Sequence, residues 1–157
     1  MKIHFWSVGN AHEIYVKQGI EIFTKRISHY YTVEWKLIPF QKNASGLSQQ
    51  DLKKAESEAI MRLLKAEDML IVLDEKGKQL TSEKLSELLQ QNANKSVKNL
   101  IFLIGGAFGV DEIIIKRANY IWSLSQLVFP HQLVRLILAE QVYRACTIIR
   151  NEKYHHS

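Results

Sequence analysis

The stretch Leu100-Ile101-Phe102-Leu103-Ile104, followed directly by Gly105-Gly106-Ala107-Phe108-Gly109, decides the fold of this chain. Five consecutive apolar residues are typical of a strand that is buried on both faces, as strands of parallel sheets are. A second run of this kind extends from Met69 to Leu73. Together the two runs predict an α/β fold, with a mostly parallel sheet that is covered by helices on both faces.

Strands and helices alternate along the rest of the chain. Further strands are predicted at residues 2–8, 32–38 and 120–124, and Pro39 places the strand at 32–38 near a sheet edge. The strand that begins at Met69 is expected to stop at Asp74-Glu75-Lys76-Gly77. Helices are predicted at 12–29, 48–66, 110–118 and 130–150, and another begins at Thr81; Ser48 and Thr81 are the expected N-caps. Residues 41–50 are polar and predict a loop, and the whole of 1–157 is expected to form one domain.

Composition narrows the class of protein. Among the 157 residues, Lys and Arg outnumber Asp and Glu by 21 to 16, and the resulting net charge of +5 favours a polyanionic partner such as nucleic acid. Cys146 is the single cysteine, so an intrachain disulfide is ruled out and a small core residue is expected there. No apolar stretch approaches the roughly 18 residues of a membrane span, and the start lacks a cleavage pattern. We therefore expect a cytoplasmic protein with no membrane partner.

The candidate site follows from the strand ends, because open parallel sheets bind ligands beyond the carboxyl ends of their strands. The turn Gly105–Gly109 allows a ligand to approach the backbone and tolerates positive φ, although it could equally be a tight strand-to-helix turn. It matches neither the dinucleotide fingerprint nor a Walker loop. The segment from Ser125 to Pro130 is an apolar loop, and its Leu127, Val128 and Phe129 require cover from a flat apolar ligand or a partner subunit.

The C-terminal part has polar residues that invite both plain and functional interpretations. Glu140 and Arg144 are four residues apart, the spacing of an ion pair within a helix. His131 stands at a helix start, where a bond to the backbone is the simplest role. His155 and His156 have no Asp or Cys at ligand spacing, so we expect no metal. No convincing Ser-His-Asp or Cys-His nucleophile is present.

Several short motifs, in this order and spacing, resemble one known family over essentially the whole chain. The family is RlmH, the bacterial rRNA pseudouridine N3-methyltransferases of the SPOUT superfamily. The motifs are Leu73-Asp74 with Gly77, Ile104-Gly105-Gly106-x-x-Gly109, Ser123-Leu124-Ser125, Phe129-Pro130-His131-Gln132-Leu133-Val134-Arg135, Glu140-Gln141-Val142-Tyr143-Arg144-Ala145 and Tyr154-His155.

The resemblance implies a C-terminal trefoil knot, an obligate homodimer and S-adenosylmethionine as the methyl donor, bound in a bent form. By matching positions, the contacts to the donor would come from Leu73, Gly105, Leu124, Ser125, Gln126, Leu127, Val128 and Phe129. An apolar loop suits the flat adenine ring, and backbone N–H and C=O groups suit its polar edge.

The acceptor implied by the resemblance is a pseudouridine of large-subunit ribosomal RNA, methylated on N3 in the assembled ribosome. The residues placed at the acceptor side by family match are His131, Arg144, Tyr154 and His155. Arg144 suits a phosphate or a developing uracil oxyanion, and Tyr154 suits base stacking. Either histidine could accept the N3 proton, and the base stays open. The family's basic residue after Tyr-His is His156 here, followed by Ser157.

Two other classes of protein compete with this interpretation. A flavodoxin-like nucleotide- or flavin-binding protein requires a phosphate cradle after the first strand, and Gly9-Asn10-Ala11-His12 is poor in Gly, Ser and Thr. A non-enzymatic RNA-binding module explains the charge and leaves the apolar loop at Leu127 to Phe129 without a purpose.

Overall fold

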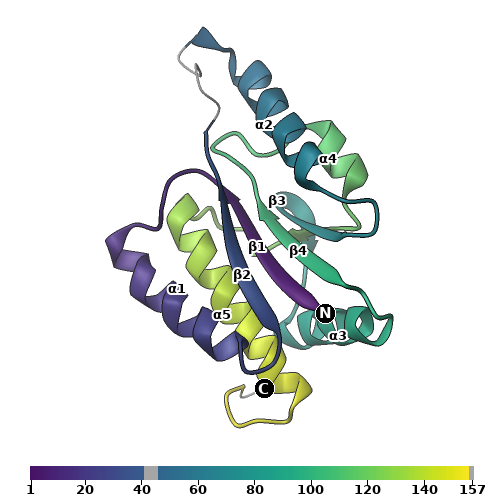
Figure 1. The fold of residues 1–157 in the computed structure, drawn as a ribbon. Coiled ribbons are helices and arrows are strands. Elements are labelled where there is room, and N and C mark those ends of the chain that lie inside the picture. The colour runs from purple at the N-terminus through teal and green to yellow at the C-terminus, as the bar shows by residue number, and fades with distance from the viewer. Residues whose placement is uncertain (41–45, 156–157) are drawn as a thin grey trace.

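The structure is a computed structural model that describes residues 1–40 and 46–155. In this part of the chain, five parallel strands form one sheet in the order β2-β1-β4-β3-β5 (Figure 1). Their bounds are β1 Lys2–Val8, β2 Thr32–Ile38, β3 Met69–Gln79, β4 Asn99–Ile104 and β5 Tyr120–Ser123. The predicted parallel sheet is confirmed, and so is the position of residues 32–38 at its edge.

Helices cover both faces of the sheet (Figure 1). One layer contains α1 (Ile14–Ile27), α3 (Ser82–Asn94) and α5 (His131–Ile149). In this layer the last helix, α5, packs against both α1 and α3. The other layer pairs α2 (Gln49–Leu63) with α4 (Glu112–Arg117).

The sheet separates two apolar clusters because successive side chains of a strand point to opposite faces. On β4, Phe102 joins the cluster under α1, α3 and α5, whereas Leu103 joins the cluster under α2 and α4. Both side chains are fully buried, as a run of apolar residues predicts. Cys146 is buried in the first cluster, in agreement with its predicted role.

The expected helix caps are confirmed. The Ser48 hydroxyl accepts a hydrogen bond from the Asp51 N–H (3.1 Å), and the Thr81 hydroxyl accepts one from the Lys84 N–H (3.2 Å). Of the expected loop over 41–50, residues 41–45 lie outside the described residues and Gln49 already begins α2. Other element ends differ from the prediction by one to three residues, as with α2, which ends at Leu63.

The expected end of the third strand was wrong. β3 does not stop at Asp74 but continues to Gln79, and after a register shift Lys78 pairs with Trp122 of β5. A Cβ at Gly77 would lie 2.7 Å from the backbone carbonyl atoms of Ile121. Gly77 therefore permits the close approach of β3 and β5. In the sequence, the same glycine makes residues 74–77 resemble a turn.

Candidate active site

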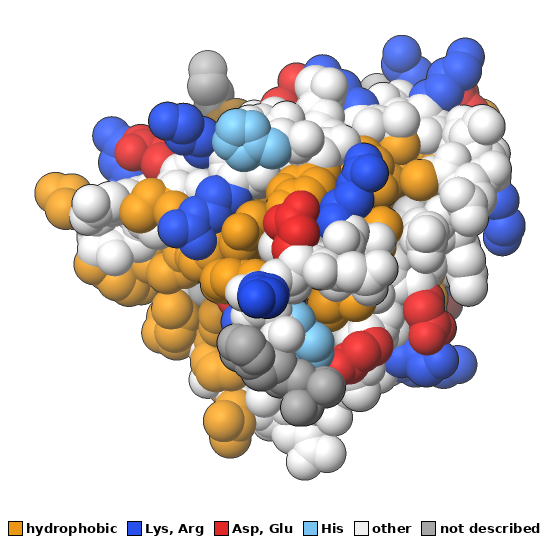
Figure 2. Space-filling view, turned by 90° about the horizontal axis from the view of Figure 1, so that it is seen from below, with side chains coloured by type: hydrophobic (Ala, Val, Ile, Leu, Met, Phe, Trp, Pro, Cys, Tyr) orange, Lys and Arg blue, Asp and Glu red, His pale blue; other side chains and the backbone are white. Residues whose placement is uncertain are grey.

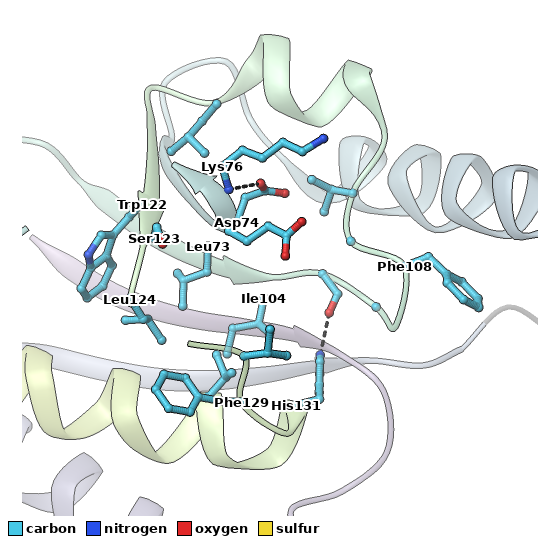
Figure 3. A pocket seen from close by; sticks show the side chains of 18 of the residues that line it. Leu73, Asp74, Lys76, Ile104, Phe108, Trp122, Ser123, Leu124, Phe129 and His131 are labelled. Carbon is cyan, nitrogen blue, oxygen red and sulfur yellow. Dashed lines mark hydrogen bonds between the residues drawn. The ribbon is translucent and has the colours of Figure 1, made fainter. Parts of the chain in front are cut away.

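A cavity of about 1010 Å³ opens at the carboxyl ends of β4 and β5 and beside residues 73–76 of β3 (Figure 3). Its apolar wall includes Leu73 from β3, Ile104 from β4, and Leu124 and Phe129 from the loop after β5. The structure thus brings together all the residues that were expected to hold the methyl donor: Leu73, Gly105, Leu124, Ser125, Gln126, Leu127, Val128 and Phe129. This volume and this mixture of apolar side chains and backbone polar groups suit a nucleoside-sized ligand.

The glycine turn forms one wall of the cavity. The Gly109 N–H donates to the Gly106 carbonyl (3.0 Å), and Gly109 has a φ of +78°, which a residue with a side chain rarely adopts. Gly105 is different, because a Cβ there would lie 2.8 Å from Cγ1 of Val110. Within the turn, positive φ is therefore confined to Gly109, and the packing of the turn on itself excludes a side chain at Gly105.

The loop after β5 is held by its own serines. The Ser123 hydroxyl donates to the Ser125 carbonyl (3.0 Å), and the Ser125 hydroxyl accepts from the Leu127 N–H (2.9 Å). Leu127 and Val128 remain 72% and 89% exposed in the single chain. These side chains line the mouth of the cavity without being covered by the chain itself.

His131 is the only expected acceptor-side residue that reaches this cavity within one chain. Its Nε2 lies 2.6 Å from the Gly105 carbonyl oxygen (Figure 3). Because a carbonyl only accepts, Nε2 carries the proton and donates it. Burial lowers the pKa of His131 and outweighs the hydrogen bond to Gly105, which raises it, and the positive charge of Arg135 lowers it as well. The ring is therefore neutral at pH 7 and keeps a lone pair on Nδ1.

Arg144, Tyr154 and His155 lie near the opposite end of α5. The Arg144 guanidinium pairs with Glu140 and lies 4.8 Å from the centre of the Tyr154 ring, and the Tyr154 hydroxyl donates to Glu140 (3.1 Å). His155 Nε2 bonds Oε1 of Glu83 at 2.7 Å. Thirteen residues of helix separate His131 from Arg144, about 20 Å at 1.5 Å per residue. One chain therefore does not bring all four residues together.

The C-terminal end is also more ordered than an exposed tail. Tyr154 and His155 are half-buried, and the Tyr154 ring packs 4.8 Å from the ring of Tyr143. Burial raises the pKa of Tyr154, and the neighbouring Glu140 raises it further. His156 and Ser157, which depart from the family pattern, lie outside the described residues.

Two buried charged residues were missed from the sequence. Arg135 is fully buried and donates to the Ser7 hydroxyl (2.9 Å), to the Asn10 carbonyl (2.9 Å) and to Nδ1 of His12 (3.3 Å). Glu56 is buried against the glycine turn. Arg135 lies one turn after His131 in α5, and Glu56 lies one turn before Ile60 in α2. Both positions belong to the apolar face of the helix. A charge on an apolar helix face is a signal that could have identified both.

Parallel topology and a ligand-sized cavity at the strand ends define an α/β cofactor-binding protein. Within that class the chain belongs to the SPOUT methyltransferases, since a family model described as "Predicted SPOUT methyltransferase" matches residues 1–155. The family expected from the motifs is confirmed, and it decides against the flavodoxin-like and non-enzymatic alternatives.

Curated relatives support the same assignment. A protein of Cytophaga hutchinsonii named "Ribosomal RNA large subunit methyltransferase H" is 46% identical over 156 residues, covering 99% of this chain and all of the relative. Proteins with the same name from Flavobacterium johnsoniae and Alkaliphilus oremlandii are 44% and 41% identical, each over 99% of both chains.

Two kinds of feature are absent from residues 1–40 and 46–155. No helix in these ranges is long and apolar enough to cross a membrane. They also contain no cluster of three or more His, Cys, Asp or Glu side chains that could hold a metal ion.

Proposed function

We propose that this protein transfers a methyl group from S-adenosylmethionine to N3 of a pseudouridine in large-subunit ribosomal RNA, within the assembled ribosome. The observation that carries the proposal is the cavity that Leu73, the glycine turn and the loop 124–129 form together. The names of the curated relatives support ribosomal RNA of the large subunit as the methyl acceptor. A ribosomal substrate implies action in the cytoplasm, and the basic balance of the chain suits it.

The residues of the cavity fit the proposed donor. Leu73, Ile104 and Leu124 offer apolar contact to a flat adenine ring, and they lie close together in Figure 3. The glycine turn has no side chains at residues 105, 106 and 109, so its backbone forms this wall of the cavity. When bound, the donor supplies an activated methyl group on a positively charged sulfur.

The protein's own task is to align the acceptor and to remove a proton. Attack by N3 forms the N3–C bond, leaves the S–C electron pair on sulfur, and requires the N3 proton to pass to a base. His131 qualifies because its ring is neutral and Nδ1 keeps a lone pair. His155 is the other candidate, and Arg144 suits the charge that develops on the uracil oxygen.

A homodimer would complete the site. Since Arg144, Tyr154 and His155 lie about 20 Å from His131 along α5, we infer that the C-terminal end of one protomer reaches the cavity of its partner. The surface offers apolar area for such an interface: large exposed side chains include Ile14 (92%), Tyr15 (61%) and Val128 (89%). Figure 2 shows hydrophobic side chains gathered along one side of the molecule. We propose, with the family, that the last segment threads a trefoil knot.

A methylation assay tests the proposed function. Purified protein and donor with a labelled methyl group are incubated with assembled ribosomes, with separated large subunits and with naked ribosomal RNA, and the product is mapped by mass spectrometry. We expect one labelled pseudouridine, from assembled ribosomes. Label at a different type of base, or binding of flavin mononucleotide instead of S-adenosylmethionine in calorimetry, would overturn the proposal.

A further inference from the structure

Glu56 is a buried carboxylate that the proposed reaction leaves unused. It lies on the inner face of α2, where only 5% of the residue is exposed. Its carboxyl group occupies the space that a side chain at Gly106 would fill. The next residue, Ser57, accepts a hydrogen bond from the Asp111 N–H (2.8 Å), which fixes α2 to the chain just beyond the glycine turn.

This carboxylate lacks a counter-charge within the described residues. Across 1–40 and 46–155, no side chain forms an ion pair or a hydrogen bond with Glu56, and burial is the single cause that raises its pKa. A buried carboxylate without a partner is costly for a fold. A cation that arrives with a ligand would supply the missing counter-charge.

The cavity in front of Gly106 suits a cation. Gly105 and Gly106 separate Glu56 from the cavity by the thickness of one backbone segment. Among the described residues, three carboxylates and two ammonium groups line the cavity, although the chain as a whole has a net charge of +5. Their residues are Asp74, Glu75 and Glu112 for the carboxylates, and Lys53 and Lys76 for the ammonium groups. The net charge of these cavity residues is therefore negative, whereas the net charge of the whole chain is positive.

We propose that Glu56 determines specificity for a charged donor: its carboxylate is the counter-charge of a sulfonium group bound in front of Gly106. The inference rests on the proposed function. Methyl transfer turns the sulfonium into a neutral thioether, so the attraction to Glu56 ends when the methyl group leaves. The same residue would hold the fresh donor and favour release of the spent one.

Calorimetry with the dimeric protein tests this role without relying on catalysis. The probes are S-adenosylmethionine, the neutral product S-adenosylhomocysteine and the amine analogue sinefungin, which has an ammonium group beside the position of the sulfonium. In Glu56→Gln we expect affinity for the two cations to fall on the order of tenfold, as for a unit charge about 10 Å away at an effective dielectric constant of about 20. Affinity for the neutral product should stay within about twofold of wild type, because no charge pair is lost there.

Control variants separate charge from shape. Glu58→Gln removes an exposed carboxylate from the same helix and should change none of the three affinities. Glu56→Asp keeps the charge and should keep the preference for cations. If Glu56→Gln does not fold, Glu56→Met replaces it as the test, because methionine fills the space without a polar group. This variant should also lose the preference for cations.

Two results would overturn the inference. Equal losses for all three probes would mean that Glu56 only shapes the turn, and unchanged affinities in Glu56→Gln would mean that its charge does not reach the ligand. Failure of the wild-type protein to bind S-adenosylmethionine would instead count against the proposed function.

Discussion

His131 connects the start of α5 to the glycine turn through its Nε2, and its burial makes the stability of the fold depend on pH. Burial lowers the pKa of His131 below its ordinary 6.5. Below about pH 6.5 the unfolded chain therefore binds more protons than the folded one. The contribution of His131 to stability is complete above that pH and is lost as the pH falls toward the folded-state pKa.

We expect His131→Gln, whose amide can still donate to Gly105, to cost about 1 kcal/mol at pH 7.5. The variant should lose less stability than wild type between pH 7.5 and pH 5, because it has one fewer buried group to protonate. Urea denaturation at both pH values measures this difference. His12, whose pKa burial also lowers, would leave a residual acid dependence in both proteins. Equal losses in the two proteins would show that His131 does not titrate in this range.

Gly105 is expected to tolerate no side chain. Valine there would meet Cγ1 of Val110 at 2.8 Å and the Gly109 backbone at 3.0 Å. We expect Gly105→Val to lose about 2 kcal/mol by overpacking and to lose donor binding because the turn shifts. Chemical denaturation and calorimetry measure the two effects. Gly46→Val is the matched control, since nothing lies within 4 Å of a Cβ at Gly46.

The residues of the donor cavity could be predicted from the sequence, because they follow parallel strands whose carboxyl ends share one edge. The strand-end argument pointed to the turn that begins at Gly105 and to the loop that contains Phe129, and the resemblance to the family added Leu73. The apolar helix face around Glu56 marks this residue as unusual, but no pattern in the sequence says which turn α2 covers, so its place beside the cavity could not be predicted. The separation of Arg144 from His131 was also invisible, since motif order says nothing about which protomer completes a site.

Among the elements, β3 shows where sequence patterns fail. Asp74-Glu75-Lys76-Gly77 has the composition of a turn, yet the backbone continues because β5 pairs again at Lys78. The strand partner is remote in sequence, so a local pattern cannot report it. The other strands were predicted to within a residue or two because their apolar runs are interrupted by true breakers such as Pro39.

Gly77→Ala tests the close approach of β3 and β5. The new methyl group would lie 2.7 Å from backbone atoms of Ile121 and Trp122, which cannot rotate away. We expect a loss of about 3 kcal/mol in the free energy of unfolding. Thermal denaturation measures it, with Gly46→Ala as the control. An unchanged melting temperature would mean that the two strands separate easily at this point.

The C-terminal end is expected to matter more for catalysis than for folding. Deleting Tyr154 to Ser157 removes the packing of Tyr154 on Tyr143 and the bond of His155 to Glu83, a loss of about 1–2 kcal/mol. Donor affinity should change little, whereas methyl transfer to ribosomes should be abolished. Arg144→Ala should behave similarly. If the truncated protein methylates ribosomes at the wild-type rate, Tyr154 and His155 do not belong to the active site.

For the whole molecule, mixed dimers decide which chain completes which site. Gly105→Val has a defective cavity and an intact C-terminal end, and the truncated chain has the reverse. After the two are unfolded and refolded together in equal amounts, about a quarter of wild-type activity should return, since half of the dimers are mixed and each has one complete site. Each variant alone should be inactive. No recovery, with light scattering showing mixed dimers, would mean that each chain completes its own site.

Because α5 follows α1 and α3 in the chain and lies between them, translation delivers the middle of this helical layer after its two sides. Until then the apolar side chains of Phe5 and Phe102 lack part of their cover. A nascent chain interrupted before His131 would present that face to chaperones and proteases. An enzyme proposed to modify finished ribosomes therefore depends, for its own folding, on a ribosome that translates its message through α5.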